Sequence, residues 1–192
     1  MDYHMVLSLN VELIMTNNLP RVFLPATNDH RVSCTTMMFK PIAYVLVGIP
    51  ASGKTTWAEK QEWIEDCAYI STDHHIEEYA KLVGKTYSEV FDDYMPTAVN
   101  LMAADVLDAV NDGMDIVWDQ TSTTVKSRRR KFKMLTGYRI IAVVFRIPDD
   151  TTLAKRLLSR PGKNIPWDDV QRMKSQFVMP TKDEGFHEIW FT

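Results

Sequence analysis

Apolar residues in this chain gather into short runs, and longer segments with helical spacing separate these runs. The runs are rich in β-branched and aromatic residues, which is typical of strands buried in a parallel sheet. The predicted strands are 42–47, 68–71, 115–118, 139–145 and 188–191.

Helices are predicted between these strands, because polar and apolar residues recur there every three or four positions and Gly or Pro closes most of the segments. The longest one ends at Gly113, and we expect Pro96 near its first turn. Strands that alternate with helices predict an α/β fold of three α/β/α layers with a parallel sheet. The other predicted helices are 56–66, 76–82, 123–135, 149–160 and 166–177.

A phosphate-binding loop is predicted between the first strand and the first helix, where residues 48–56 read GIPASGKTT. Glycines at this spacing let backbone N–H groups point at phosphate oxygens, and the following helix adds the positive end of its dipole. Lys54 can reach the β- and γ-phosphates, and the Thr55 hydroxyl can hold Mg²⁺. We therefore expect a nucleoside triphosphate to be bound by Gly48, Pro50, Ala51, Ser52, Gly53, Lys54, Thr55 and Thr56.

Two aspartates follow predicted strands, at the edge of the sheet where ligands bind in such folds. Asp73 follows strand 68–71, where a carboxylate can accept a proton from an acceptor hydroxyl. Asp119 follows strand 115–118 as a Walker-B aspartate does, and can orient water on Mg²⁺ or hold the acceptor. The alternative for either aspartate is a helix N-cap, where this residue type is common.

Charge and composition limit the classes of function. With 45% hydrophobic and 24% charged residues, the 192-residue chain is not a disordered protein and has room for one domain with a real core. Because the net charge is −3, any contact with nucleic acid needs a local basic patch. Residues 127–133 offer such a patch, with Arg128 and Arg129 as candidate contacts to phosphates. The alternative is a solvated helix face.

A second basic cluster contains Arg156 and Arg160, which lie one helical turn apart and precede Pro161-Gly162. This arrangement suits a lid that closes arginines over transferring phosphates. Surface charge without function is the alternative. The neighbouring histidines His74 and His75 predict no metal site, because adjacent helical positions point apart and no third ligand is suitably spaced.

The chain is expected to be a cytoplasmic protein without a membrane segment. Cys34 and Cys67 form no CxxC pair, no apolar run reaches spanning length, and Asp2 stands where a signal peptide would carry a cation. Residues 39–192 are predicted to form the domain, and residues 1–38 an extension of unknown role. That extension is either an appended strand or arm, or an artefact of an incorrectly assigned start codon, with translation beginning at Met37 or Met38.

Several of these motifs together resemble the kinase domain of polynucleotide 5′-hydroxyl kinases, both of phages and of eukaryotic DNA-end-healing enzymes. The motifs are GIPASGKTTW at 48–57, STD at 71–73, VWDQT at 117–121, and Arg156 and Arg160 ahead of Pro166. The C-terminal residues 177–189 resemble the eukaryotic form, and the likeness covers roughly residues 40–192.

This resemblance implies an adenylate-kinase-like topology with a small lid, and ATP with Mg²⁺ as cofactors. It implies Asp73 as general base toward a 5′-hydroxyl, Asp119 on the acceptor side, and Arg160, supported by Arg156, at the transferring phosphoryl group. Residues 74–77 are His-His-Ile-Glu, whereas the phage enzymes carry an arginine shortly after the aspartate. No DxDxT segment of a fused 3′-phosphatase occurs.

We therefore expect a kinase that transfers the γ-phosphate of ATP to a nucleic-acid hydroxyl, most simply the 5′-OH end of DNA or RNA. The alternatives are a kinase of hydroxymethylated bases in DNA, a small-molecule P-loop kinase, and a nucleotide-binding regulatory module without an acceptor. A regulatory module has no need of Asp73 or of lid arginines, and a small-molecule kinase has no need of the basic run. The acceptor, the preference for DNA or RNA and the oligomeric state stay open.

Overall fold

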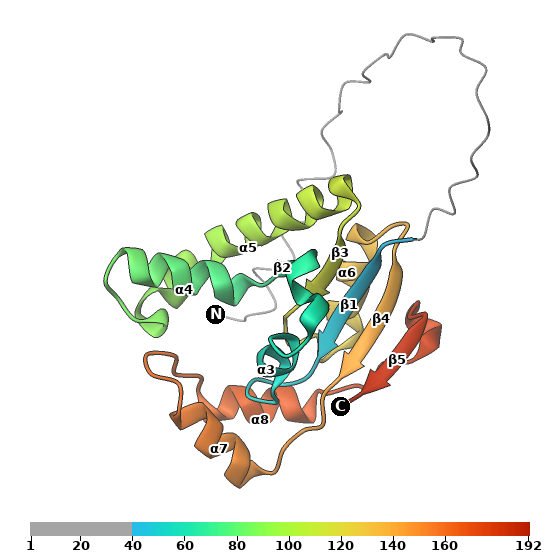
Figure 1. Cartoon of the computed structure of the whole chain (residues 1–192). Coiled ribbons are helices and arrows are strands. Elements are labelled where there is room, and N and C mark those ends of the chain that lie inside the picture. Colours follow the sequence, from blue (N-terminus) through green and yellow to red (C-terminus); the bar gives the residue numbers. More distant parts are fainter. Residues whose placement is uncertain (1–39) are drawn as a thin grey trace, which may run out of the picture. The chain divides into compact units, whose positions relative to one another are not determined.

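A parallel sheet forms the centre of the domain (Figure 1). The structure, a computed structural model, describes residues 40–192, so the predicted extension 1–38 lies outside the described residues. The five strands pair in the order β2-β3-β1-β4-β5, and every pairing is parallel. This arrangement confirms the predicted P-loop α/β fold. The strands are β1 Ile42–Val47, β2 Cys67–Ile70, β3 Asp115–Trp118, β4 Arg139–Val144 and β5 Glu188–Phe191.

Helices cover both faces of this sheet because the strand side chains alternate between two apolar clusters. Val45 and Trp118 pack with Met102 and Val106 of α5 on one face, whereas Leu46 packs toward α3 and η1 on the other. Among residues 40–192, no helix is both long and apolar enough to cross a membrane. The helices are α3 Lys54–Ala58, α4 Thr72–Leu82, α5 Tyr87–Asp112, α6 Val125–Met134, α7 Asp150–Leu158 and α8 Trp167–Ser175, with 3₁₀ helices η1 Glu62–Asp66 and η2 Lys182–Glu184.

Three predicted helices differ from the observed ones. The helix predicted over 76–82 begins four residues earlier, at Thr72, as α4. The first predicted helix was expected to run to about Asp66, but α3 ends at Ala58 and a turn separates it from η1. Pro96 was expected near a first turn, but α5 begins at Tyr87 and contains Pro96 in its interior. The helix starts earlier because Thr86 and Glu89 form a capping box that satisfies its first backbone N–H groups.

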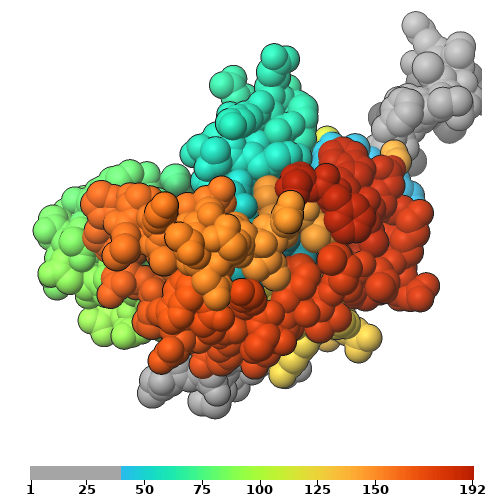
Figure 2. All heavy atoms as spheres, turned by 90° about the horizontal axis from the view of Figure 1, so that it is seen from below, coloured from blue at the N-terminus to red at the C-terminus, as the bar shows by residue number. Residues whose placement is uncertain are grey.

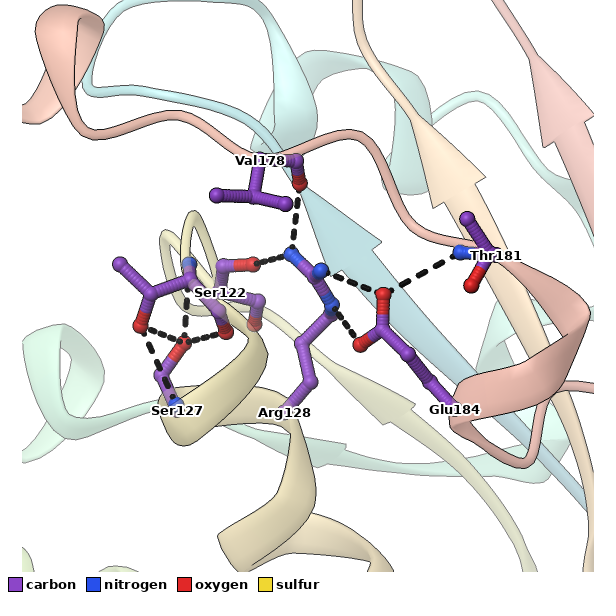
Figure 3. A network of polar contacts seen from close by, with 7 residues as sticks. Ser122, Ser127, Arg128, Val178, Thr181 and Glu184 are labelled. Carbon is purple, nitrogen blue, oxygen red and sulfur yellow. Dashed lines mark hydrogen bonds and ion pairs between the residues drawn. The ribbon is translucent and has the colours of Figure 1, made fainter.

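Arg128 lies inside the protein, and its prediction as a contact to nucleic acid is wrong (Figure 3). The side chain is fully buried, and Nε and Nη2 donate to the two carboxylate oxygens of Glu184 at 2.8 and 2.7 Å. Its Nη1 donates to the backbone oxygens of Ser122 and Val178, each at 3.0 Å. This paired guanidinium joins α6 to the C-terminal segment and is not available to a ligand.

The basic run is therefore divided between two faces of α6. Arg128, Lys131 and Leu135 are buried, whereas Arg129 and Lys133 are exposed. The Lys131 ammonium donates to Gln120 Oε1 at 2.7 Å and lies 5.0 Å from the centre of the Trp118 ring. Burial, with a smaller effect of Arg130, lowers the pKa of Lys131 to about 7. Only the outward part of the run remains for a partner.

We predict that Arg128→Met destabilises the domain strongly. The change leaves the Glu184 carboxylate, whose side chain is only 10% exposed, without its cation, and breaking a buried pair costs about 3–5 kcal/mol. Arg129→Met, which removes an exposed charge from the same helix, is expected to change stability by less than about 0.5 kcal/mol. Chemical denaturation of both variants checks this difference, and equal losses would contradict the structural role of Arg128.

Candidate active site

The carboxyl ends of β1, β2 and β3 meet at one edge of the sheet. The Gly48 N–H donates to the Thr121 oxygen, and the Asp119 N–H donates to the Ile70 oxygen, both at 2.9 Å. These two bonds hold the start of the P-loop and the ends of β2 and β3 next to one another. In Figure 1, α7 and α8 lie beyond the arrowheads of the strands, on the same side as this edge.

The P-loop has the close backbone packing that a phosphate cradle requires. Ala51 and Gly53 have positive φ values of 61° and 102°. A Cβ at Gly48 would lie 2.5 Å from Ser52 Oγ, so the glycine is needed for close approach. Ser52 Oγ is buried and has no hydrogen-bond partner among residues 40–192, an arrangement that fits a phosphate oxygen as partner.

Lys54 is a buried cation at the start of α3. Its side chain donates to the Ile49 oxygen at 3.0 Å, and burial lowers its pKa against the opposing effect of Asp119 and Asp73. From α7, Arg156 Nη1 donates to the Ala51 oxygen at 3.0 Å and so lies on the same loop. Both cations are placed to contact phosphate groups in the cradle.

Asp119 joins the P-loop to the end of β3. Its Oδ2 accepts hydrogen bonds from Thr55 Oγ1 at 2.7 Å and from Tyr69 OH at 2.6 Å. Burial and the Asp119 carboxylate raise the pKa of Tyr69, so the phenol stays a donor. Asp119 is not the cap of α6, because Thr124 occupies that position. The hydroxyl and carboxylate oxygens of Thr55 and Asp119 are the hard ligands that suit Mg²⁺.

Asp73 is the second residue of α4, and its side chain is turned toward α5 and the segment after α7. Its Oδ1 accepts from Tyr87 OH at 2.8 Å, and its Oδ2 accepts from Lys163 Nζ at 2.7 Å. Lys163 also donates to Glu77 Oε1 at 2.8 Å. Side-chain partners on two other elements therefore fix this carboxylate, which is not what a simple helix cap shows.

Residues 159–165, which we call the lid segment, connect α7 to α8. Its Gly162 oxygen accepts from the Ser88 N–H at 3.0 Å, so the segment lies on the first turn of α5. Figure 2 shows the orange surface of α7 and the lid segment against the green surface of α4 and α5. The charge of Arg160 acts on Lys54 and lowers its pKa, and the Arg160 guanidinium has no hydrogen bond or ion pair among residues 40–192.

The structure thus brings together the P-loop, Asp73, Asp119, Arg156 and Arg160, while Arg129 lies exposed on α6. Three further residues of the site, Tyr69, Tyr87 and Lys163, were missed. Lys163 follows the Pro-Gly pair of the predicted lid, which was a usable signal. The two tyrosines gave no signal, because a tyrosine in a strand or helix is most often core.

Comparisons with known proteins agree with this geometry. A family described as "AAA domain" matches residues 44–180. The bifunctional polynucleotide phosphatase/kinase of Schizosaccharomyces pombe is 27% identical over 150 residues, which cover 76% of this chain and 32% of that protein. The chain therefore spans about a third of this relative, and the match confirms the resemblance to polynucleotide kinases.

Two solved structures share the fold. A candidate kinase from Chloroflexus aurantiacus superposes with a TM-score of 0.63 at 18% identity, covering 80% of this chain and 88% of that one. A chain of the Pnkp1/Rnl/Hen1 RNA repair complex superposes with a TM-score of 0.54 at 19% identity, covering 75% and 46%. At these identities the likeness concerns the fold alone.

We predict that Lys54→Met weakens ATP binding by roughly tenfold or more, because a buried charge-assisted contact to phosphate is lost. The same change is expected to leave the free energy of unfolding equal or higher, since the cost of burying an ammonium disappears. Calorimetric titration with ATP and chemical denaturation measure the two effects. Lys60→Met, an exposed change just after α3, is the control. Unchanged ATP affinity of Lys54→Met would contradict the assignment of the loop.

Proposed function

The chain belongs to the AAA domain family of P-loop proteins, and we propose that it is a kinase that phosphorylates the 5′-hydroxyl end of DNA or RNA with ATP. The observation that carries this proposal is the Asp73 carboxylate beside the P-loop. Its charge opposes the lowering of the Lys54 pKa by burial, and both of its oxygens accept hydrogen bonds. A fixed carboxylate next to a phosphate cradle is what proton removal from an acceptor hydroxyl requires.

The residues of the site divide into three roles. Lys54, Arg156 and Arg160 are cations at the cradle and the lid, and they stabilise charge on the transferring phosphates. Thr55 and Asp119 would hold Mg²⁺, with Tyr69 orienting the Asp119 carboxylate. When bound, ATP supplies the phosphoryl group and Mg²⁺ neutralises part of its charge.

Asp73 acts on the acceptor. Its carboxylate accepts the proton of the attacking hydroxyl, while Tyr87 and Lys163 keep it in one orientation. The acceptor then approaches on the side of the cradle where α4 and α5 place Asp73 and Tyr87.

Nucleic acid as the acceptor is supported by sequence rather than by a wide basic surface. The fission-yeast relative, a polynucleotide phosphatase/kinase, is 27% identical across 76% of this chain. Arg129 and Lys133 remain exposed on α6 and can contact a phosphate backbone. Because the chain spans only 32% of that relative, the proposal covers the kinase activity and not the phosphatase.

A small-molecule kinase is the second candidate. Asp73 and Glu77 carry two negative charges against the single positive charge of Lys163, so this side of the site does not attract a phosphate backbone. A regulatory module that only binds nucleotide is disfavoured, because such a protein needs neither a fixed Asp73 nor an arginine such as Arg160 on a lid. The hydroxymethylated bases of DNA stay an alternative acceptor within the kinase class.

We predict that Asp73→Asn lowers transfer of the γ-phosphate to a 5′-OH oligonucleotide by about 10²–10⁴-fold, which is the usual contribution of a general base. The amide cannot act as a base, so transfer slows. Because the amide keeps the shape of the carboxylate, ATP affinity is expected to stay the same. Glu78→Gln, an exposed change on the same helix, is the matched control. Single-turnover transfer from labelled ATP measures both variants. Full activity in Asp73→Asn would rule out this residue as the base.

We predict that Arg129→Ala raises the KM for a 5′-OH oligonucleotide and reduces the salt slope of acceptor binding by about one, as loss of a single phosphate contact does. The KM for ATP is expected to stay unchanged, because Arg129 lies on α6 and not at the cradle. Lys182→Ala, which removes an exposed cation from η2, serves as the control. If the salt slopes of the variant and the wild type are identical, α6 takes no part in binding the acceptor.

A further inference from the structure

We propose that Lys163 is a positioning residue that ties the lid segment to the general base, so that Asp73 is correctly oriented only while the lid lies on α5. The inference rests on the proposed function, because the role of Asp73 as base belongs to it. It adds a link between two parts of the site that the sequence motifs treat separately.

The ammonium of Lys163 is held by three groups at once. It donates to Asp73 Oδ2 at 2.7 Å and to Glu77 Oε1 at 2.8 Å, and it lies 4.2 Å from the centre of the Tyr87 ring. The Lys163 side chain is only 12% exposed, although those of Asp73 and Glu77 are 45% and 47% exposed. The Lys163 ammonium is therefore shielded from solvent between two half-exposed carboxylates and an aromatic ring. Its contacts differ in this respect from an ordinary surface ion pair.

The backbone on both sides of Lys163 is fixed to the start of α5. The Ser88 N–H donates to the Gly162 oxygen at 3.0 Å, and the Asn164 N–H donates to Ser88 Oγ at 2.7 Å. A Cβ at Gly162 would lie 3.0 Å from Thr86 Cβ, so this turn sits close to the helix. These contacts determine the direction in which Lys163 points.

Two consequences follow for the site. Asp73 is oriented by one donor on α5, Tyr87, and one donor on the lid segment, Lys163. Arg160, at the other end of the same segment, lies close enough to Lys54 to change its pKa. Lifting the lid segment therefore removes a donor from the base and a cation from the cradle together. Chemistry is confined to the closed state, which limits hydrolysis of ATP when the lid is open.

A double-mutant cycle tests the link. Lys163→Ala is expected to lower kcat for the 5′-OH oligonucleotide roughly tenfold to a hundredfold, because a mispositioned base loses most of its advantage. The KM for ATP is expected to stay unchanged. Lys163→Arg is expected to restore part of the loss, and Lys182→Ala to have no effect. In an Asp73→Asn background, Lys163→Ala is expected to cost little more, since it acts through the missing carboxylate.

Additive losses in the cycle would overturn the positioning role and leave Lys163 with a structural role only. The contact between the lid segment and α5 is tested separately, by amide hydrogen exchange at Ser88 and Asn164 in the protein without substrate. Both amides are expected to exchange faster in Lys163→Ala than in Lys182→Ala. Equal exchange would overturn the link to the lid. A wild-type protein that binds ATP but phosphorylates no acceptor would refute the proposed function, whatever the exchange result.

Discussion

The parallel pairing of β3 with both β1 and β2 determines where the P-loop, Asp73 and Asp119 lie relative to one another. Parallel strands place their carboxyl ends at one edge of the sheet, and a different group follows each strand there: the P-loop after β1, Asp73 after β2 and Asp119 after β3. The bonds from Gly48 to Thr121 and from Asp119 to Ile70 continue the pairing beyond the strands. A shift of register in β3 would separate Asp119 from Thr55, although both motifs would still be present in the sequence.

Three cations of the described domain are buried, and each burial costs free energy because a positive charge leaves water. The three differ in whether they stabilise the structure or are available for function. Arg128 satisfies four hydrogen bonds to Glu184, Ser122 and Val178, and so belongs to the framework. Lys131 has one hydrogen bond and a ring contact, and burial lowers its pKa to about 7. Among residues 40–192, Lys54 donates to one backbone oxygen and the Ser52 hydroxyl of the same loop has no partner, which leaves Lys54 available for an anion. The degree of pairing, rather than burial, separates the framework cation from the functional one.

Most of the fold and part of the site could be predicted from the sequence, because local signals carried them. The apolar strands and the glycine spacing of the P-loop are short-range patterns, and the strand ends then brought Asp73 and Asp119 near Lys54. The prediction for Arg128 was wrong because its partner Glu184 is 56 residues away in the sequence. One clue existed, since Arg128, Lys131 and Leu135 share the spacing of a buried helix face. The roles of Tyr87 and Lys163 could not be predicted, because they depend on the packing of the lid segment on α5, which no sequence motif describes.

The central claim is that the acceptor is the 5′-hydroxyl end of a nucleic acid. A single comparison tests it most directly: transfer from γ-labelled ATP with Mg²⁺ to DNA and RNA oligonucleotides with a 5′-OH, to the same oligonucleotides already 5′-phosphorylated, to 5′-phosphorylated duplexes with hydroxymethylated bases, and to small-molecule hydroxyl compounds. The account predicts label on the 5′-OH oligonucleotides alone. Label on the blocked duplexes would move the acceptor to a base, and label on small molecules alone would contradict the nucleic-acid assignment.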